Sequence, residues 1–285
     1  MAKNFIIDEN GVLVKYEGTE SIVVIPSGVT AIGKSAFWCY KLTSVVIPDS
    51  VTTIGEDAFK YASLTSVTIP DSVTTIEKYA FEYCRALTSV IIPDSVTTIG
   101  RGTFSYCTSL KSITIPDSVT SIGDYAFRQT SLESVTIPDN VTSIGYGAFE
   151  DCTSLTSVVI PDSVTTIGSC AFMGTSLTNI TIPDGVTSIE SHAFYGCTSL
   201  KSITIPDSVT TIEKRAFYEC TSLTNITIPD SVTTIGEGAF EGCTSLKSIT
   251  IPDSVTTIGE GAFRGTSLES VDASKTLLIR LIKNL

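Results

Sequence analysis

Polar and apolar residues alternate over short segments that recur along most of the chain. In residues 66–69, serine and threonine alternate with valine and isoleucine. This alternation is the period of a β-strand that buries one face, and β-branched residues favour that conformation. The pattern therefore predicts a short strand whose apolar face packs on a core.

Three further segments complete the repeating unit. Residues 70–72 (Pro-Asp-Ser) predict a turn, because Pro lacks an N–H and because Asp and Ser bond the local backbone. Residues 73–76 predict a second short strand with its apolar ends inward. Residues 77–81 predict a helical turn that places Ala80 and Phe81 in the core. Most other units begin this turn with Gly, which permits a tight bend.

The proline of this unit recurs at steps of 22 or 23 residues and at no others. The eleven prolines are Pro26, Pro48, Pro70, Pro93, Pro116, Pro138, Pro161, Pro183, Pro206, Pro229 and Pro252. A period of this length indicates a solenoid, in which each repeat packs mainly on its neighbours. We therefore predict a right-handed solenoid of about eleven repeats over residues 20–271, with parallel strands and short helical or 3-10 turns.

Both ends of the array differ from its interior. In residues 1–19, two apolar runs flank Asn10-Gly11, a dipeptide typical of hairpin turns, so we predict an N-terminal β-hairpin cap. Residues 272–285 predict a C-terminal capping helix that begins at Asp272 or Ser274, because four apolar residues recur at helical spacing. These four are Leu278, Leu281, Ile282 and Leu285.

The unit L-x-S-V-T-I-P-D-S-V-T-T-I-G-x-x-A-F-x-x-C resembles the BspA-like class of leucine-rich repeat. Residues 11–18, which lead into residues 25–29, also resemble the entry sequence of that family. The resemblance covers roughly residues 5–271 and implies a parallel-strand solenoid. It also implies a surface or secreted adhesin, as found in host-associated microbes and some protists.

The net charge of −12 limits the classes of partner. Nucleic acids and anionic membranes require clustered Lys and Arg, so we expect neither as a partner. The sequence contains no run of about 18 apolar residues, so we expect no membrane insertion. The first residues lack the apolar region of a signal peptide. The location therefore stays open between the cell surface, which the resemblance implies, and the cytoplasm.

Seven of the eight cysteines lie three residues before the leucine of a repeat. They are Cys39, Cys84, Cys107, Cys152, Cys197, Cys220 and Cys243. All six 23-residue steps carry this cysteine, so it mostly accompanies the extra loop residue; Cys39, in a 22-residue step, is the exception. We interpret it as a small buried thiol that plugs the loop. Disulfides between adjacent repeats and metal binding stay as alternatives.

Residues suited to catalysis or to metal binding are scarce. His192 is the only histidine, and Tyr79, Tyr125, Arg215 or Gly238 fill the same position in other repeats. A single histidine supplies neither a two-histidine metal site nor a catalytic triad without partners on the same turn. We therefore expect no enzymatic activity, no metal and no cofactor.

Variation among the repeats concentrates on both sides of the Ala-Phe pair, whereas strand and core positions hardly change. Tyr, Trp and Arg are the residues that most often carry the binding energy of interfaces, and most of the tyrosines here lie in the N-terminal half. We therefore predict a protein-binding surface on this side of the solenoid. Its candidates are Trp38, Tyr40, Tyr61, Tyr79, Tyr83, Tyr106, Tyr125 and Tyr146. The alternative is that these side chains only pack over the core.

Three functions remain open from the sequence. The first is a non-enzymatic scaffold for protein binding or adhesion, with a host or surface protein as its partner. The second is a structural component, such as a surface layer, that self-associates. The third is an ice-binding solenoid, because the outward strand positions form a grid of Ser and Thr, although Val46, Ile91 and Val159 interrupt it.

Overall fold

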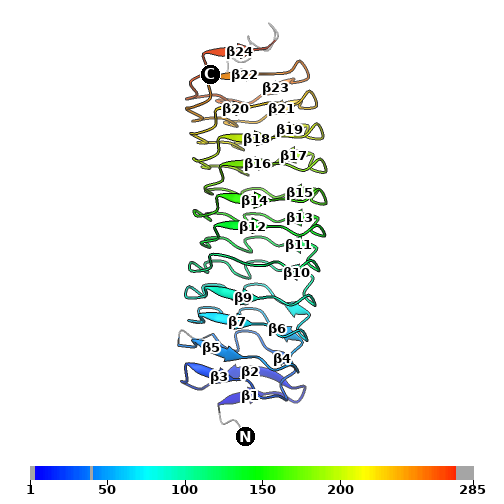
Figure 1. Ribbon diagram of the computed structural model, residues 1–285, viewed down its shortest axis with the longest axis vertical. Helices are drawn as coiled ribbons and strands as arrows, with labels where there is room; N and C mark the ends of the chain where they lie inside the picture. The colour runs from blue at the N-terminus through cyan, green and yellow to red at the C-terminus, as the bar shows by residue number, and fades with distance from the viewer. Residues whose placement is uncertain (1–3, 39–40, 274–285) are drawn as a thin grey trace.

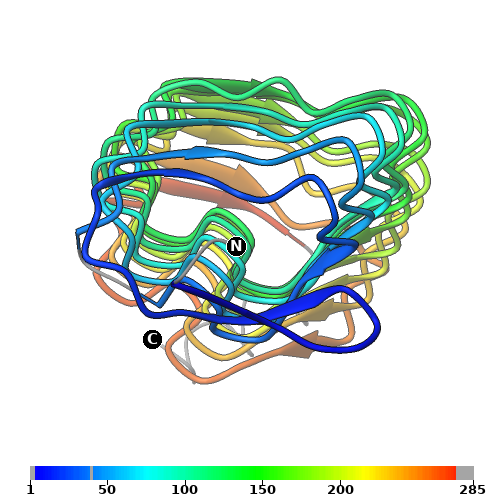
Figure 2. The same ribbon diagram turned by 90° about the horizontal axis from the view of Figure 1, so that it is seen from below.

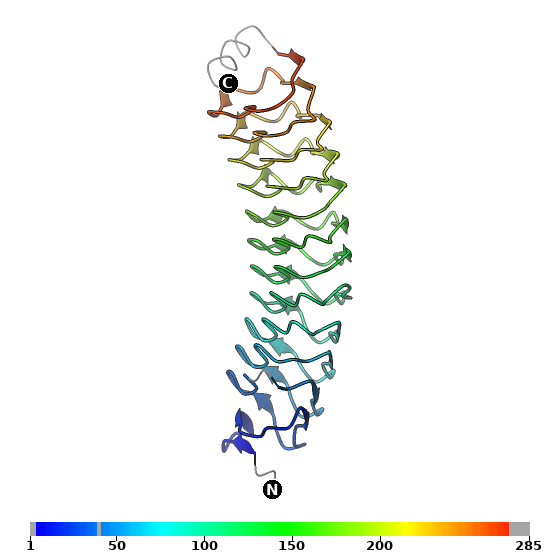
Figure 3. The same cartoon turned by 90° about the vertical axis from the view of Figure 1, so that its left-hand side faces the viewer.

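The computed structural model describes residues 4–38 and 41–273. The repeats stack along one long axis into a rod, and each repeat contributes one rung (Figure 1). Viewed along that axis, the successive rungs superpose on one closed outline (Figure 2). From the side they form a single continuous row (Figure 3). The predicted parallel-strand solenoid is confirmed.

One face of the rod is built from the first strand of each repeat, which we call the long-strand face. Its strands pair in parallel and in register, as where Ser66 of β7 lies opposite Ser89 of β9. The strands are β3 (Ile22–Val24), β5 (Ser44–Val46), β7 (Ser66–Thr68), β9 (Ser89–Ile91), β12 (Ser134–Thr136), β14 (Ser157–Val159), β16 (Asn179–Thr181), β18 (Ser202–Thr204), β20 (Asn225–Ile226), β22 (Ser248–Thr250) and β24 (Ser270–Asp272). Residues 111–115 continue this face without a regular strand.

A second face is built from two-residue strands that follow the Pro-Asp turn. They are β4 (Ala31–Ile32), β6 (Thr53–Ile54), β8 (Thr75–Ile76), β10 (Thr98–Ile99), β11 (Ser121–Ile122), β13 (Ser143–Ile144), β15 (Thr166–Ile167), β17 (Ser188–Ile189), β19 (Thr211–Ile212), β21 (Thr234–Ile235) and β23 (Thr257–Ile258). Serine at the turn links the rungs, as where Ser50 Oγ donates to the carbonyl oxygen of Val29 over 2.7 Å. The turn thus fixes the spacing between neighbouring repeats.

The N-terminal hairpin is present as predicted. Strand β1 (Phe5–Ile7) pairs antiparallel with β2 (Val12–Tyr16), and β2 then pairs in parallel with β4. At the other end, Asp272 lies in β24 opposite Thr250. The rest of the predicted C-terminal helix falls on residues 274–285, which lie outside the described residues.

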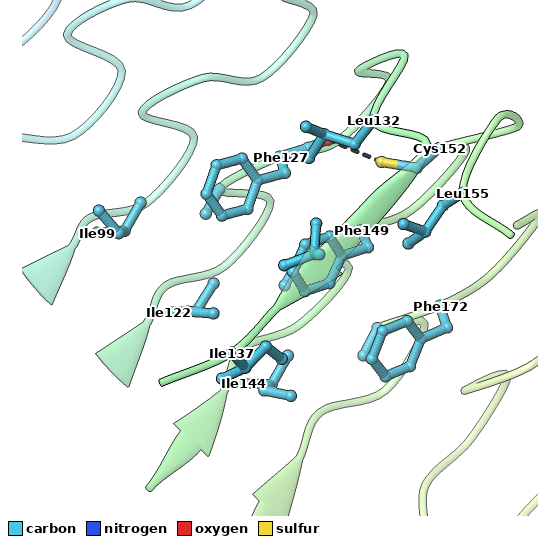
Figure 4. Close-up of a cluster of buried hydrophobic side chains, with 14 of the residues drawn as sticks. Ile99, Ile122, Phe127, Leu132, Ile137, Ile144, Phe149, Cys152, Leu155 and Phe172 are labelled. Atoms are coloured by element: carbon cyan, nitrogen blue, oxygen red, sulfur yellow. Dashed lines mark hydrogen bonds between the residues drawn. The ribbon is translucent and has the colours of Figure 1, made fainter. Parts of the chain in front are cut away.

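The core is a continuous column of stacked phenylalanines surrounded by buried aliphatic side chains (Figure 4). Phe149 and Phe172, for example, have ring centroids 5.5 Å apart and planes that differ by 1°. Both side chains are fully buried. Each buried phenylalanine contributes roughly 1.5–3 kcal/mol relative to exposure. One repeat alone cannot bury its ring, so neighbouring repeats stabilise one another.

The helical or 3-10 turn predicted before each phenylalanine is not confirmed. The described part of the chain contains no helix, and two consecutive β-turns stand in this place. In one repeat, Ala58 N–H donates to Gly55 O over 3.2 Å and Lys60 N–H donates to Asp57 O over 3.1 Å. Asp57 has a φ of 56°. A residue in this left-handed region reverses the chain and cannot continue a right-handed helix.

The glycine that opens these turns serves close packing rather than a special φ. At Gly236 and Gly259, φ lies outside the left-handed region. A Cβ added to Gly236 would lie 2.5 Å from the backbone nitrogen of Lys214 in the preceding rung. A Cβ added to Gly259 would lie 2.3 Å from the nitrogen of Glu237. The rungs therefore approach closely at these two glycines, whereas Glu77, Glu190 and Glu213 occupy the equivalent position in other repeats.

Candidate binding surface

Two positions in each repeat have left-handed backbone, and both belong to the variable segment around phenylalanine. The position two residues before the phenylalanine is left-handed in all eleven repeats, from Ser35 to Gly261. The position two residues after it is left-handed in the ten repeats where it is described, from Tyr61 to Gly265. Glycine fits this conformation without strain, yet thirteen of the sites carry another residue.

Tyrosines occupy three successive copies of the second position and stack on one another. The ring centroids of Tyr61 and Tyr83 are 4.7 Å apart, and those of Tyr83 and Tyr106 are 4.3 Å apart. Trp38 meets Tyr61 edge to face at 6.2 Å, and the tryptophan is 58% exposed. Burial and the neighbouring Tyr106 raise the pKa of Tyr83. The file is therefore ordered, and Trp38 presents the most exposed ring.

A parallel file occupies the first left-handed position, where tyrosine alternates with glycine. A Cβ added to Gly102 would lie 2.4 Å from a ring carbon of Tyr79, so the ring lies over this glycine. The guanidinium of Arg101 fills the gap, 5.9 Å from the ring of Tyr79 and 5.7 Å from that of Tyr125. Tyr146 lies beside this file, one residue before the left-handed Gly147, and meets Tyr125 edge to face at 5.1 Å; it is 42% exposed.

Two of the cations that lie against these rings, Lys60 and Arg128, form ion pairs. Lys60 Nζ lies 2.7 Å from a carboxylate oxygen of Glu82 and 3.1 Å from one of Asp57. Although burial opposes the charge of Lys60, the hydrogen bonds to Glu82 and Asp57 raise its pKa. Arg128 pairs with Glu150 at 3.0 Å. The surface therefore combines aromatic rings with ion pairs.

Two hollows lie on either side of Tyr61. One, of about 430 Å³, is lined by Ser35, Trp38, Asp57, Lys60 and Tyr61. The other, of about 400 Å³, is lined by Tyr61, Ala62, Ser63, Tyr83, Arg85 and Ala86, and we call it the Arg85 pocket. Both hollows are bordered by Tyr or Trp rings. Tyr, Trp and Arg side chains often contribute strongly to protein–protein binding.

The structure brings the predicted site residues together on one corner of the solenoid. We call them the aromatic corner: Trp38, Tyr61, Tyr79, Tyr83, Tyr106, Tyr125 and Tyr146. The eighth candidate, Tyr40, lies outside the described residues. Sequence reasoning missed the cations Lys60, Arg101 and Arg128 that lie against these rings. The sequence did indicate these cations, because they lie in the same variable segments around the Ala-Phe pair as the tyrosines.

The described repeat cysteines are free and buried, as expected. The thiol of Cys152 donates to the carbonyl oxygen of Phe127 over 3.0 Å. Thr130 and Thr175 occupy the same position, three residues after phenylalanine, in 22-residue repeats. The additional residue of a 23-residue repeat therefore follows the cysteine. The cysteine serves to link one rung to the next.

His192 lies at the left-handed position two residues before Phe194. It has a φ of 59° and lies 5.6 Å from the ring of Tyr195. Burial, together with the charges of Arg215 and Lys214, lowers its pKa, so the ring is neutral at pH 7. Among the described residues, no group of three or more His, Cys, Asp or Glu side chains is placed to hold a metal ion.

Parallel strands on one side, tight turns opposite and files of identical core residues define a leucine-rich-repeat solenoid. The profile of the BspA type leucine rich repeat region matches six copies, over residues 16–88, 74–179 and 165–280. The chain belongs to this family. Proteins of this family are generally non-enzymatic scaffolds that bind protein partners.

Three similar proteins with solved structures come from bacteria. A leucine-rich cell surface protein of Faecalibacterium prausnitzii is 32% identical, with a TM-score of 0.57 over 96% of this chain and 94% of its own. A leucine-rich repeat protein of Eubacterium ventriosum is 25% identical, with a TM-score of 0.53 over 88% and 77%. The pneumococcal vaccine antigen PcpA shares the fold at 24% identity, with a TM-score of 0.66 over 95% and 72%.

Comparison with functionally curated proteins finds none that match this chain. Within residues 4–38 and 41–273, no helix has the length and apolar character needed to cross a membrane.

Proposed function

We propose that this protein is an adhesion scaffold that binds a host or surface protein through the aromatic corner. The observation that carries the proposal is the stacked file Tyr61–Tyr83–Tyr106 with Trp38 exposed at its end. Aromatic rings that are already ordered lose little conformational entropy on binding. Tyr and Trp are also the residues that dominate interface energies.

The backbone at these sites supports the proposal. A non-glycine residue in the left-handed region costs roughly 1–2 kcal/mol, and Tyr61, Tyr79, Tyr83, Tyr106 and Tyr125 all adopt it. In the C-terminal half, glycine fills several equivalent sites, such as Gly238 and Gly261. The array therefore tolerates glycine there, and retaining tyrosine in the N-terminal half carries a stability cost that binding would explain.

The experiment compares two tyrosine variants for stability and for binding. A partner is cross-linked from extracts of host and bacterial surface proteins, purified, and titrated against the wild-type protein and Y61S/Y83S/Y106S. Y195S/Y218S is the control, because it removes another stacked pair, at 4.8 Å, outside the aromatic corner. We expect the first variant alone to weaken binding more than tenfold. Equal binding by all three proteins, with melting lowered, would show that the rings serve packing only.

A second candidate function is self-association at the N-terminal end. Ile22 and Val24 of β3 are 68% and 65% exposed, and Ile6 and Val14 of the hairpin are 44% and 48% exposed. Exposed apolar side chains grouped at one end favour contact with another surface. Light scattering over a range of protein concentrations tests this function, and a constant monomer mass would exclude it.

A further inference from the structure

Two residues that line the Arg85 pocket, Arg85 and Ala86, differ from the consensus of the repeat. The other five 23-residue repeats have Thr-Ser between cysteine and leucine, whereas this repeat has Arg85-Ala86. The five consensus pairs are 108–109, 153–154, 198–199, 221–222 and 244–245. The change replaces a hydroxyl pair with one cation and one methyl group.

The backbone at this departure keeps the geometry of the other repeats. Arg85 N–H donates to the carbonyl oxygen of Tyr83 over 2.8 Å, and Thr153 N–H donates to that of Asp151 over the same distance. Leu87 N–H and Leu155 N–H likewise donate to the carbonyl oxygens of Cys84 and Cys152, over 3.0 and 2.9 Å. The fold therefore does not require Arg85, and its side chain alone distinguishes the pocket.

The guanidinium of Arg85 is held in place but not neutralised. It lies over the ring of Tyr83, 5.6 Å from the centroid. Arg128, by contrast, pairs with Glu150 at 3.0 Å. No carboxylate of the described residues lies within ion-pair distance of Arg85. Arginine presents a planar fork of donors that matches a carboxylate through two parallel hydrogen bonds.

We propose that the Arg85 pocket binds the carboxylate of a glutamate or aspartate side chain on the protein partner. This inference rests on the proposed function and names the chemistry of its anchor. Ala62, Ala86 and the rings of Tyr61 and Tyr83 supply apolar walls for the methylene groups beside the carboxylate. A net charge of −12 disfavours polyanions, so a single acidic group is the favoured occupant.

The test is a titration of the intact protein with a short peptide. Acetyl-Ala-Glu-Ala-amide is added at pH 6, and the Nε–Hε resonance of Arg85 is followed by NMR. We expect a saturable shift, and we expect acetyl-Ala-Gln-Ala-amide to bind at least tenfold more weakly. An equal response to both peptides would overturn the assignment, because the amide has the same shape without the charge.

Two variants distinguish binding by the whole pocket from binding by an exposed arginine alone. R85T restores the repeat consensus, so the fold is retained, and we expect the tyrosine resonances to lose their response to the glutamate peptide. T198R places arginine at the same point of a repeat in which Gly174 and Gly196 stand where Tyr61 and Tyr83 stand. It should bind no better than wild-type Thr198. If the glutamate peptide bound the arginine of T198R as tightly as it binds Arg85, its binding would be nonspecific charge pairing and the pocket would play no part.

A further arm distinguishes the source of the carboxylate. The methyl glycoside of N-acetylneuraminic acid replaces the peptide, and tighter binding of this sugar acid by tenfold or more would overturn the protein assignment. Failure of this inference is distinct from failure of the proposed function. A partner that binds R85T as tightly as wild type, but loses affinity for Y61S/Y83S/Y106S, rejects the carboxylate anchor and retains the aromatic corner.

Discussion

The thiol of Cys152 donates a hydrogen bond to the carbonyl oxygen of Phe127 in the preceding repeat, over 3.0 Å. The same bond recurs at Cys84, Cys107, Cys197, Cys220 and Cys243, over 3.1–3.3 Å. All six side chains are fully buried. The cysteines therefore connect successive rungs directly behind the phenylalanine column.

Removal of this thiol should destabilise the solenoid. We expect Cys152→Ala to lower the free energy of unfolding by about 1–2 kcal/mol, through the lost bond and the small cavity. Cys152→Thr should recover at least half of that loss, because threonine occupies the same position at Thr130 and Thr175. Urea unfolding of the three proteins measures both effects. Equal stabilities for the alanine and threonine variants would contradict a role for the donor.

The buried thiols should also make the protein sensitive to alkali. Burial raises the pKa of Cys152 from 9.0 to about 11. Above pH 9 the thiol ionises in the unfolded chain while it stays protonated in the folded one, so the stability falls as pH rises toward and past 11. For Cys152 the loss amounts to roughly 2–3 kcal/mol.

Cys152→Thr provides the matched comparison for this pH dependence, because threonine does not ionise in the range. The difference in unfolding free energy between wild type and this variant should shift in favour of the variant above pH 9. Tyrosine and lysine titrate equally in both proteins and cancel. Parallel stability curves from pH 7 to 11 would refute the prediction.

Glycine at a left-handed site outside the aromatic corner should stabilise the protein. Glu219 has a φ of 56°, whereas Gly196 and Gly242 fill the equivalent positions in the adjacent repeats. We expect Glu219→Gly to raise the unfolding free energy by about 0.5–1 kcal/mol, because the left-handed strain exceeds the entropy that glycine adds to the unfolded chain. Glu241→Gly, at a site without positive φ, should lower it; thermal unfolding distinguishes the two signs.

Adding one methyl group at the turn glycine Gly236 should destabilise the protein, because neighbouring rungs pack closely there. Gly236→Ala places a Cβ 2.5 Å from the nitrogen of Lys214, so the rungs must separate. We expect a loss of about 1–3 kcal/mol, as for other overpacking substitutions. Gly28→Ala is the control, because a Cβ there meets nothing within 4 Å. Equal melting temperatures for the two variants would be inconsistent with this account.

Much of the fold was predictable from local patterns. Alternation in residues 66–69 gives the strand, and the proline period gives the stacking, because both depend on which side chains must leave water. The turn before phenylalanine was not predictable in the same way. A left-handed residue such as Asp57 has no distinctive sequence signal, and the pattern of Ala58 and Phe59 is equally typical of a helix.

The candidate site was predictable only as a region. Variation among repeats pointed to the tyrosines, because positions free of core packing can change. Their arrangement required the structure: Tyr61, Tyr83 and Tyr106 stack because successive rungs bring equivalent side chains 4.3–4.7 Å apart. The sequence gives no direct measure of that separation, nor of Arg101 lying between rings two rungs apart.

The sequence by itself therefore determined the architecture. Each repeat carries the same apolar positions, and stacking the repeats into a solenoid buries all of them. Tertiary structure alone decided which cation contacts which ring, which carbonyl oxygen accepts the hydrogen bond of the Cys152 thiol, and how closely the rungs approach at Gly236. These features depend on contacts between residues more than twenty positions apart. Such contacts are set by the spacing of the rungs and not by any local preference of the chain.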